Sequence, residues 1–342
     1  MHDRDSLHRF MFEHYPIRGH LVHLDASWRA LIEHRDYPET VRDTLGEAVV
    51  ASLLLAATIK FDGVLSLQLQ GAGPVHLLLA QCTSGLGVRG LARFQENTGN
   101  PGQTYSSDVA QLIGPGNLTV TLESDDGAQR YQGIVPITGQ RLADSLQIYF
   151  ENSEQLPTRL WLYADAQGAS GMLLQRLPDP PAAGAAMVGG GGAGAAAGVA
   201  AGAAAGAAAR GVAVDTAAVD TAATDDAWRR VQLIGATLTP EELRTLSDAE
   251  ILHRLFNEDD LRLYEPSPVF FRCRCSRERV SGMLQGLGEK ETRSVLAERG
   301  EVEVRCDFCN RAYVFDAVDI EQLFKPGVVA PGIAIDAGGS VH

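Results

Sequence analysis

The sequence predicts an α+β fold: a mixed α/β core domain with antiparallel sheets and a buried helix, then a helical linker and a small cysteine-rich C-terminal domain. Three observations indicate this. An apolar segment of helical periodicity lies near residue 50, runs that alternate apolar and polar residues surround it, and four of the five cysteines fall between residues 273 and 309. The 342 residues suffice for about two domains, and 45% of them are hydrophobic, so the chain can bury a core.

The segment TVRDTLGEAVVASLLLAATIKF (40–61) has apolar residues at helical spacing. It carries too many of them for a helix that keeps one face in water, so we expect it to be buried. Its uncharged stretch from Ala48 to Ile59 is too short to span a bilayer.

Strand-like runs surround this helix, separated by glycine-rich turns such as GAGP (71–74) and GPGN (114–117). Two of the runs, VLSLQLQ and LTVTLE, alternate apolar and polar residues as half-buried antiparallel strands do. The expected strands lie at 21–24, 64–70, 75–80, 118–123 and 131–137.

Residues 182–214 are almost entirely alanine and glycine. The stretch is long enough to cross a membrane, but alanine is nearly neutral in transfer to a bilayer and glycine is unfavourable. A flexible low-complexity linker is therefore favoured over a transmembrane helix. The composition divides the chain into a core domain, an Ala/Gly-rich insertion, a helical linker, a cysteine-rich domain and a flexible tail, at 1–181, 182–224, 225–268, 269–325 and 326–342.

Short amphipathic helices are predicted within 225–268. Thr239 followed by Pro240 and Glu242 has the residues of a helix start with a capping box, and Ser247 with Glu250 repeats the pattern. An apolar stripe follows these caps, and we expect it to pack on a neighbouring surface in the resting protein. The stripe consists of Leu243, Leu246, Ile251, Leu252, Leu255 and Phe256.

The four clustered cysteines form two pairs. Cys273 and Cys275 are two positions apart, so in an extended segment their sulfurs face one point. Cys306 and Cys309 follow 30 residues later, in a C-x-x-C turn between the strand-like runs VEVR and AYVFD, with Asn310 suited to the tight backbone after the second sulfur. Two such pairs give the tetrahedral ligand set of zinc, and the spacing does not match the common iron–sulfur patterns.

The residues around the sulfurs leave open whether a metal here is only structural or part of a redox device. C-x-C is uncommon in structural sites, where C-x-x-C dominates. Cations near a thiol favour the reactive thiolate, although surface arginines are often merely solvated. The arginines near the pairs are Arg272, Arg274, Arg277, Arg279, Arg305 and Arg311.

The overall charge limits the possible partners. A formal net charge of −14 and a pI near 5.1 argue against broad binding to nucleic acid or to an anionic membrane. The basic cluster at 272–279 keeps a zinc module that binds nucleic acid as the alternative function. The charged N-terminus shows no secretory signal, so we expect a cytoplasmic protein with reduced thiols.

An enzyme is not predicted. The sequence has no H-E-x-x-H, G-x-S-x-G or phosphate-loop motif, and four cysteine ligands would close the coordination shell that a catalytic zinc leaves open. His20 and His23 lie close in the sequence, but scattered histidines are more typical of cores and surfaces than of a second metal site. Cys82 follows an apolar run and is expected to be a buried core residue.

Taken together, these motifs resemble the heat shock protein of 33 kDa family of redox-regulated chaperones. The resemblance extends over nearly the whole chain. It includes VRDTLGEAVVASLLLAATIKFDG (41–63), LQLQGAGPVHLL (67–78), VRGLAR (88–93), FRCRCSRERV (271–280) and CDFCNRAYVFDAVDI (306–320). The Ala/Gly-rich insertion departs from the family pattern and falls where the family joins its core to its linker helices.

The resemblance implies a function and a site. Reduced protein would hold one Zn²⁺ per chain through Cys273, Cys275, Cys306 and Cys309 and be inactive. Oxidants would convert the pairs to disulfides 273–275 and 306–309 and release zinc. The cysteine domain and linker would then lose structure, and the protein would dimerise and hold unfolding client proteins without ATP. The candidate client-binding residues of the linker are Leu243, Leu246, Leu252, Leu255 and Phe256.

Overall fold

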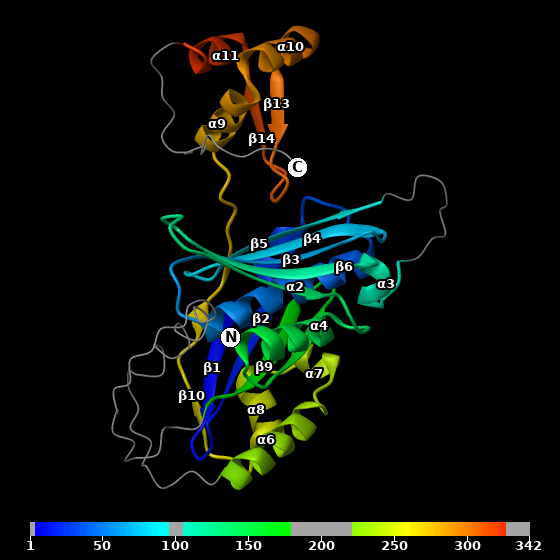
Figure 1. Cartoon of the computed structure of the whole chain (residues 1–342), viewed down its shortest axis with the longest axis vertical. Coiled ribbons are helices and arrows are strands. Elements are labelled where there is room, and N and C mark those ends of the chain that lie inside the picture. Colours follow the sequence, from blue (N-terminus) through cyan, green and yellow to red (C-terminus); the bar gives the residue numbers. More distant parts are fainter. Residues whose placement is uncertain (1–3, 96–104, 179–220, 326–342) are drawn as a thin grey trace, which may run out of the picture. The chain divides into compact units, whose positions relative to one another are not determined.

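The computed structural model describes residues 4–95, 105–178 and 221–325. The chain divides into two compact units, the first ending at Arg272 and the second beginning at Cys273 (Figure 1). The Ala/Gly-rich stretch 182–214 and the tail 326–342 lie outside the described residues, so the expectations for them stay predictions. In the described part of the chain, no helix is long and apolar enough to cross a membrane.

The first unit contains two sheets. In sheet A the strand order is β10-β1-β2-β9-β8, β11 also pairs with β1, and every pairing is antiparallel. Both neighbours of β2 are long strands, so its ladder is hydrogen-bonded along both edges. The strands are β1 (Ser6–Phe12), β2 (Ile17–Leu24), β8 (Thr158–Ala164), β9 (Ala169–Arg176), β10 (Leu261–Leu263) and β11 (Ser267–Pro268).

Sheet B has the order β12-β5-β4-β3-β6-β7 and is antiparallel except where β12 joins β5. All the strands that alternation predicted in this region are present. They bury one face and leave the other partly exposed, as in β3, which alternates buried and half-buried residues. The strands are β3 (Gly63–Gly71), β4 (Val75–Thr83), β5 (Gly87–Phe94), β6 (Gly116–Ser124), β7 (Arg130–Pro136) and β12 (Phe270–Phe271).

Helix α2 (Glu39–Thr58) is the predicted core helix, and that prediction is confirmed. It packs against strands of both sheets, and most of its side chains are buried. The largest apolar cluster of the unit forms around it and takes in residues of both sheets. Shorter helical elements complete this core: α1 (Ala26–Ile32), α3 (Val109–Ile113), α4 (Leu142–Tyr149) and a π-helical turn (Phe150–Glu154).

The linker helices cover the other face of sheet A (Figure 1). They are α6 (Thr221–Gly235), α7 (Pro240–Thr245) and α8 (Asp248–Phe256). Both predicted capping boxes are present, with Thr239 and Ser247 accepting from the backbone of Glu242 and Glu250. The second apolar cluster joins these helices to strands β1, β2 and β9.

The second unit is small. Strands β13 (Val302–Arg305) and β14 (Ala312–Phe315) form the predicted antiparallel hairpin. Up to Lys325, where the described part ends, three helices accompany it: α9 (Arg277–Leu287), α10 (Glu289–Arg299) and α11 (Ala317–Leu323). Within these described residues its core has six buried side chains, namely Val280, Leu284, Val302, Tyr313, Phe315 and Ile320. So few residues cannot be expected to supply much folding free energy alone.

Candidate metal centre

The turn of the β13–β14 hairpin holds the second cysteine pair. The amide of Cys306 donates to Arg311 O at 3.0 Å, and the amide of Asn310 donates to Cys306 O at 2.8 Å. Asn310 has φ 54°, in the left-handed region that asparagine tolerates better than most residues. The predicted role of Asn310 in the tight backbone is therefore confirmed, and the turn places both sulfurs on one side.

The first pair lies between strand β12 and helix α9. Ser276 follows directly and caps α9, accepting from the amide of Arg279. Cys273 and Cys275 lie in no regular element, and the chain becomes helical at Arg277. As the i, i+2 spacing predicts, the two sulfurs point the same way and lie 3.4 Å apart.

The two pairs meet as one group. Cys273 Sγ lies 3.5 Å from Cys306 Sγ, and Cys275 Sγ lies 3.4 Å from Cys309 Sγ. All four sulfurs lie within 4.8 Å of one another, and the cysteines are free thiols. A tetrahedron with zinc–sulfur bonds of 2.3 Å has edges of about 3.8 Å, so this donor set fits a tetrahedral metal ion. It is the only such group of cysteine, histidine and carboxylate ligands among the described residues.

The four thiols differ in their surroundings. Burial raises the pKa of Cys273 and of Cys309. Burial also opposes ionisation of Cys275, but hydrogen bonds to its sulfur, above all from the hydroxyl of Tyr313 at 3.1 Å, lower its pKa to about 7. The backbone amide of Arg311 donates to the sulfur of Cys309. The protein therefore offers hydrogen bonds to thiolate sulfur around this site, as outer-shell groups do at metal centres.

The arginines that surround the pairs in the sequence have separate contacts in the structure. Arg311 interacts with the hydroxyl of Tyr313 and, through its charge, with Cys275 and Cys309. Arg277 stacks on the ring of Phe315 and pairs with Asp319, Arg279 donates to a backbone carbonyl, and Arg305 pairs with Glu303. Arg277, Arg279 and Arg305 therefore make their contacts with groups other than the sulfurs.

The remaining cysteine and the paired histidines lie in the first unit. Cys82 is fully buried, as predicted, and burial raises the pKa of its thiol to about 12. His20 is buried as well, and desolvation lowers its pKa to about 3. His23 contacts Asp248 and the backbone of α7. No ligand group forms around either histidine in the described residues.

The apolar stripe of the linker is covered. Leu243, Leu252, Leu255 and Phe256 are buried, and Leu246 is partly buried against the same cluster. Four further linker residues belong to this cluster and were not predicted, namely Ala227, Trp228, Val231 and Leu238. The signal was available, because apolar residues recur at positions 227, 228, 231 and 234 with helical spacing.

Comparisons with known proteins agree on one family. The family model described as "Hsp33 protein" matches residues 5–316. The chain is 41% identical over 329 residues to the 33 kDa chaperonin of Methylobacillus flagellatus, covering 96% of this chain and 97% of the relative. It is 44% identical over 331 residues to that of Nitrosococcus oceani, covering 97% and 98%. The crystal structure of the 33 kDa chaperonin of Thermotoga maritima shares the fold, with a TM-score of 0.69 at 21% identity, covering 94% of this chain and 98% of that one.

Proposed function

The chain belongs to the Hsp33 family of chaperones, and from that premise we propose that it is a redox-regulated holdase whose switch is a zinc ion held by four cysteines. The observation that carries the proposal is the meeting of Cys273, Cys275, Cys306 and Cys309 within 4.8 Å in a unit with a core of six residues. A domain of this size commonly depends on its metal for folding. Zinc, one per chain, suits an all-sulfur tetrahedral set.

The activating step is oxidation of the thiolates. Two thiolates give up two electrons to hydrogen peroxide, a sulfur–sulfur bond forms, the oxygen–oxygen bond breaks, and the two hydroxide ions released take up two protons from the buffer to give two water molecules. Two such steps consume all four ligands, so zinc leaves. The second unit then loses its support, and the linker helices open.

Near-neighbour pairing is expected, although the sulfur distances include close cross pairs as well. Once the metal leaves, cysteines two or three residues apart meet at a smaller cost in chain entropy than cysteines more than 30 apart. The two-residue turn should let Cys306–Cys309 close with less strain and form before Cys273–Cys275. Mass mapping of partly and fully oxidised protein checks this; a majority of 273–306 or 275–309 crosslinks would contradict it.

The client-binding surface in this proposal is the apolar face of the linker, which is buried in the reduced protein. Opening would expose leucines and aromatic rings that can bind unfolded segments of other proteins, and two opened copies can pair as a homodimer. No ATP site is required. We expect the protein to work in the cytoplasm, where thiols are reduced until oxidative stress.

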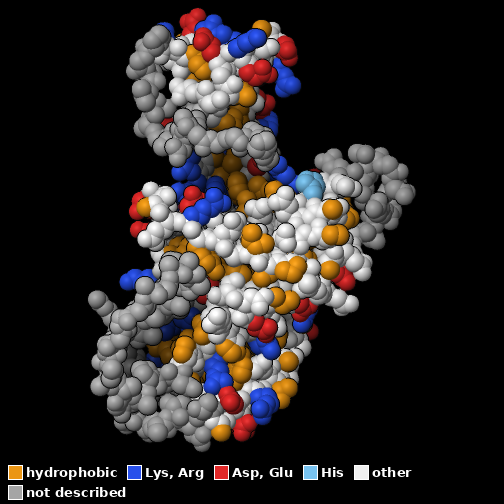
Figure 2. All heavy atoms as spheres, viewed as in Figure 1, with side chains coloured by type: hydrophobic (Ala, Val, Ile, Leu, Met, Phe, Trp, Pro, Cys, Tyr) orange, Lys and Arg blue, Asp and Glu red, His pale blue; other side chains and the backbone are white. Residues whose placement is uncertain are grey.

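Binding to nucleic acid is the less favoured alternative. The arginines near the cysteines have intramolecular contacts, and on the face in Figure 2 acidic and basic side chains are interspersed. A chaperone fits the family and an enzyme does not.

The test measures zinc content and suppression of client aggregation before and after peroxide at mildly elevated temperature. We expect one zinc per reduced chain, loss of that zinc on oxidation, and suppression of aggregation only afterwards. A protein that retains zinc when active, or one that binds DNA with a steep salt dependence and ignores oxidation, would refute the proposal.

A further inference from the structure

A buried carboxylate opens helix α8. Asp248 is the first residue of the helix, directly after the cap Ser247, and it is only 7% exposed. Its Oδ1 is shielded from solvent. By contrast, Glu250 in the same turn is exposed. Since a buried charge is costly unless it is paired, Asp248 needs partners on the surface that α8 covers.

Two histidines of sheet A supply them. His23 Nδ1 on β2 lies 2.7 Å from Asp248 Oδ1, and His8 Nδ1 on the neighbouring strand β1 contacts Oδ2. Burial alone would raise the pKa of Asp248, but the contacts with His23 and His8 outweigh it and hold this pKa at about 2. The carboxylate is therefore ionised and is contacted by two histidines beneath the linker.

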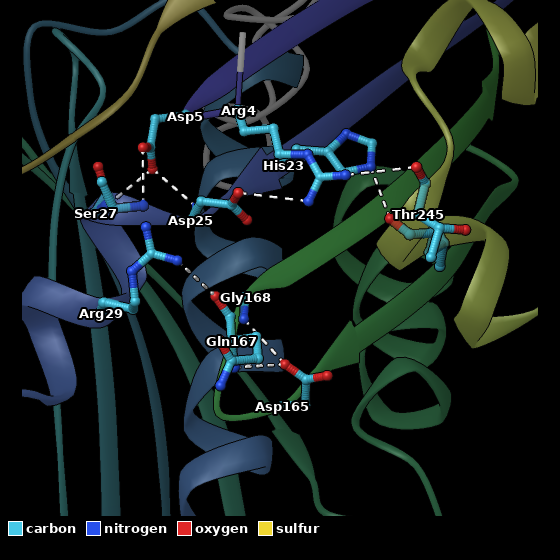
Figure 3. Close-up of polar contacts among 12 residues, drawn as sticks. Arg4, Asp5, His23, Asp25, Ser27, Arg29, Asp165, Gln167, Gly168 and Thr245 are labelled. Carbon is cyan, nitrogen blue, oxygen red and sulfur yellow. Dashed lines mark hydrogen bonds and ion pairs between the residues drawn. The ribbon is translucent and has the colours of Figure 1, made fainter. Parts of the chain in front are cut away.

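His23 contacts the linker at a second point. Its Nε2 lies 2.7 Å from the backbone oxygen of Leu243 in α7. Each ring nitrogen of His23 therefore has an oxygen of the linker as its neighbour. Figure 3 shows His23 reaching α7 beside Thr245, whose backbone oxygen accepts from Arg4, and Arg4 in turn pairs with Asp25. The ring thus joins the body of α7 and the first residue of α8 to the sheet.

The rest of this interface is apolar. At the far end of α8, Phe256 packs against Phe10 and Phe12 with ring centroids 6.4 and 5.2 Å away. Apolar contacts are non-directional and favour burial without fixing one position. A buried ion pair is satisfied in one position only, which is how such groups specify register in some proteins. Other carboxylates that pair with the sheet, such as Asp225 and Asp260, are at least half exposed.

We propose that Asp248, His8 and His23 form an ionic latch that fixes α8 on sheet A and keeps the apolar face of the linker covered before oxidation. The latch itself concerns only the docking of the linker; its consequence for client binding rests on the proposed function. Oxidation then acts on a linker that the latch still holds on sheet A. Weakening the latch should lower the amount of oxidant required to activate the chaperone.

The primary test is hydrogen exchange on reduced, zinc-loaded, full-length Asp248→Asn. The variant keeps the shape of the side chain and removes its charge. We expect amide exchange at 240–256 to rise by about tenfold to a hundredfold, because the histidines lose the buried carboxylate that they contact. Exchange in α2 should stay as in the parent and reports that the core is folded. Equal exchange at 240–256 in variant and parent would overturn the latch.

Two substitutions of His23 give an independent test. His23→Asn keeps an amide donor near the position of Nδ1 and so retains a contact to Asp248. His23→Gln places its donor near the position of Nε2 and retains only the contact to Leu243 O. The latch predicts faster exchange in His23→Gln than in His23→Asn, and the reverse order would contradict it.

The matched control is Asp260→Asn. Asp260 also pairs with a histidine, His14, at 3.0 Å, but both side chains are largely exposed, so exchange at 240–256 should not change. Client aggregation assays separate the two proposals. Faster exchange in Asp248→Asn without chaperone activity in any oxidised sample would keep the latch and refute the holdase. If the parent protein is activated by oxidant but exchange in Asp248→Asn is unchanged, the holdase proposal stands and the latch is refuted.

Discussion

The aromatic contact between the linker and sheet A makes Phe256→Ala an informative perturbation. Phe256 is 1% exposed and packs on Phe10 and Phe12 at the end of α8. Truncating a buried phenylalanine to alanine typically costs about 3–5 kcal/mol, through lost burial and the cavity left behind. Because Phe256 belongs to the cluster that attaches the linker, most of this cost should fall on linker docking and little on α2.

A loss of about 3 kcal/mol corresponds to roughly a hundredfold increase in the open fraction of the linker. We therefore expect amide exchange at 225–265 to accelerate by at least that factor in reduced, zinc-loaded protein, with α2 unchanged. Part of the aggregation-suppressing activity should appear without oxidant. The control is Leu233→Ala in α6, which removes an apolar side chain from the same linker at a position that is 68% exposed. It should change neither measurement.

The decisive result is the exchange rate, since Phe256 could also contribute to gripping clients and its loss could lower activity. Unchanged exchange at 225–265 in Phe256→Ala would show that the linker does not depend on this packing. Faster exchange without any gain of activity, in a variant that still responds to oxidant, would show that opening the linker is not sufficient for client binding.

Three more predictions concern the metal, the insertion and acid. Reduced Cys306→Ser should bind zinc far more weakly than the parent, measured by competition with a chelator, and equal affinity would refute the four-cysteine site. Deleting 184–209 should leave zinc binding and oxidant activation nearly intact, because alanine and glycine bury too little area to offset the entropy of ordering; loss of either would assign the segment a role in the linker. The pKa of Asp248 is lowered from 3.8 to about 2 in the docked state, so the contribution of its carboxylate to docking should be fully present above about pH 4 and be lost, at a cost of about 2 kcal/mol, as the pH falls through 2. Trp228 fluorescence can follow this, and Asp248→Asn should remove that part of the acid dependence.

Patterns of local origin were predictable from the sequence. Alternation identified β3 and β6 because sheet B buries one face of each, and apolar density identified α2 because both sheets cover it. Capping residues located the starts of α7 and α8. The two cysteine pairs could be predicted because each pair lies within a few adjacent residues. That the two pairs come together at one site depends on the fold.

What escaped prediction depends on burial from two sides or on distant contacts. Strand β9 is buried at seven of its eight positions, since α2 contacts it on one side and the linker cluster includes residues of its other face, so no alternation marks it. Strand β1 also lacks a regular alternation of buried and exposed residues, because Leu7 packs in the core around α2 and Phe10 and Phe12 pack in the linker cluster. The latch joins His8 and His23 to a residue more than 220 positions away, and neither a histidine in a strand nor an aspartate at a helix start signals such a partner.

The order of elements along the chain gives a physical route from the cysteines to the linker. Immediately before Cys273 the chain passes through β12 and β11, each of two residues, and β10, of three. Such short edge strands are among the first elements to open in local unfolding, because few hydrogen bonds hold each one. If oxidation unfolds the second unit, opening would have to pass these short strands, where Val269 is the one buried residue, before it reaches α8. There the aromatic contact of Phe256 comes first and the latch at Asp248 last, so the latch, at the far end of the helix, would decide whether opening stops at the edge strands or releases the whole linker.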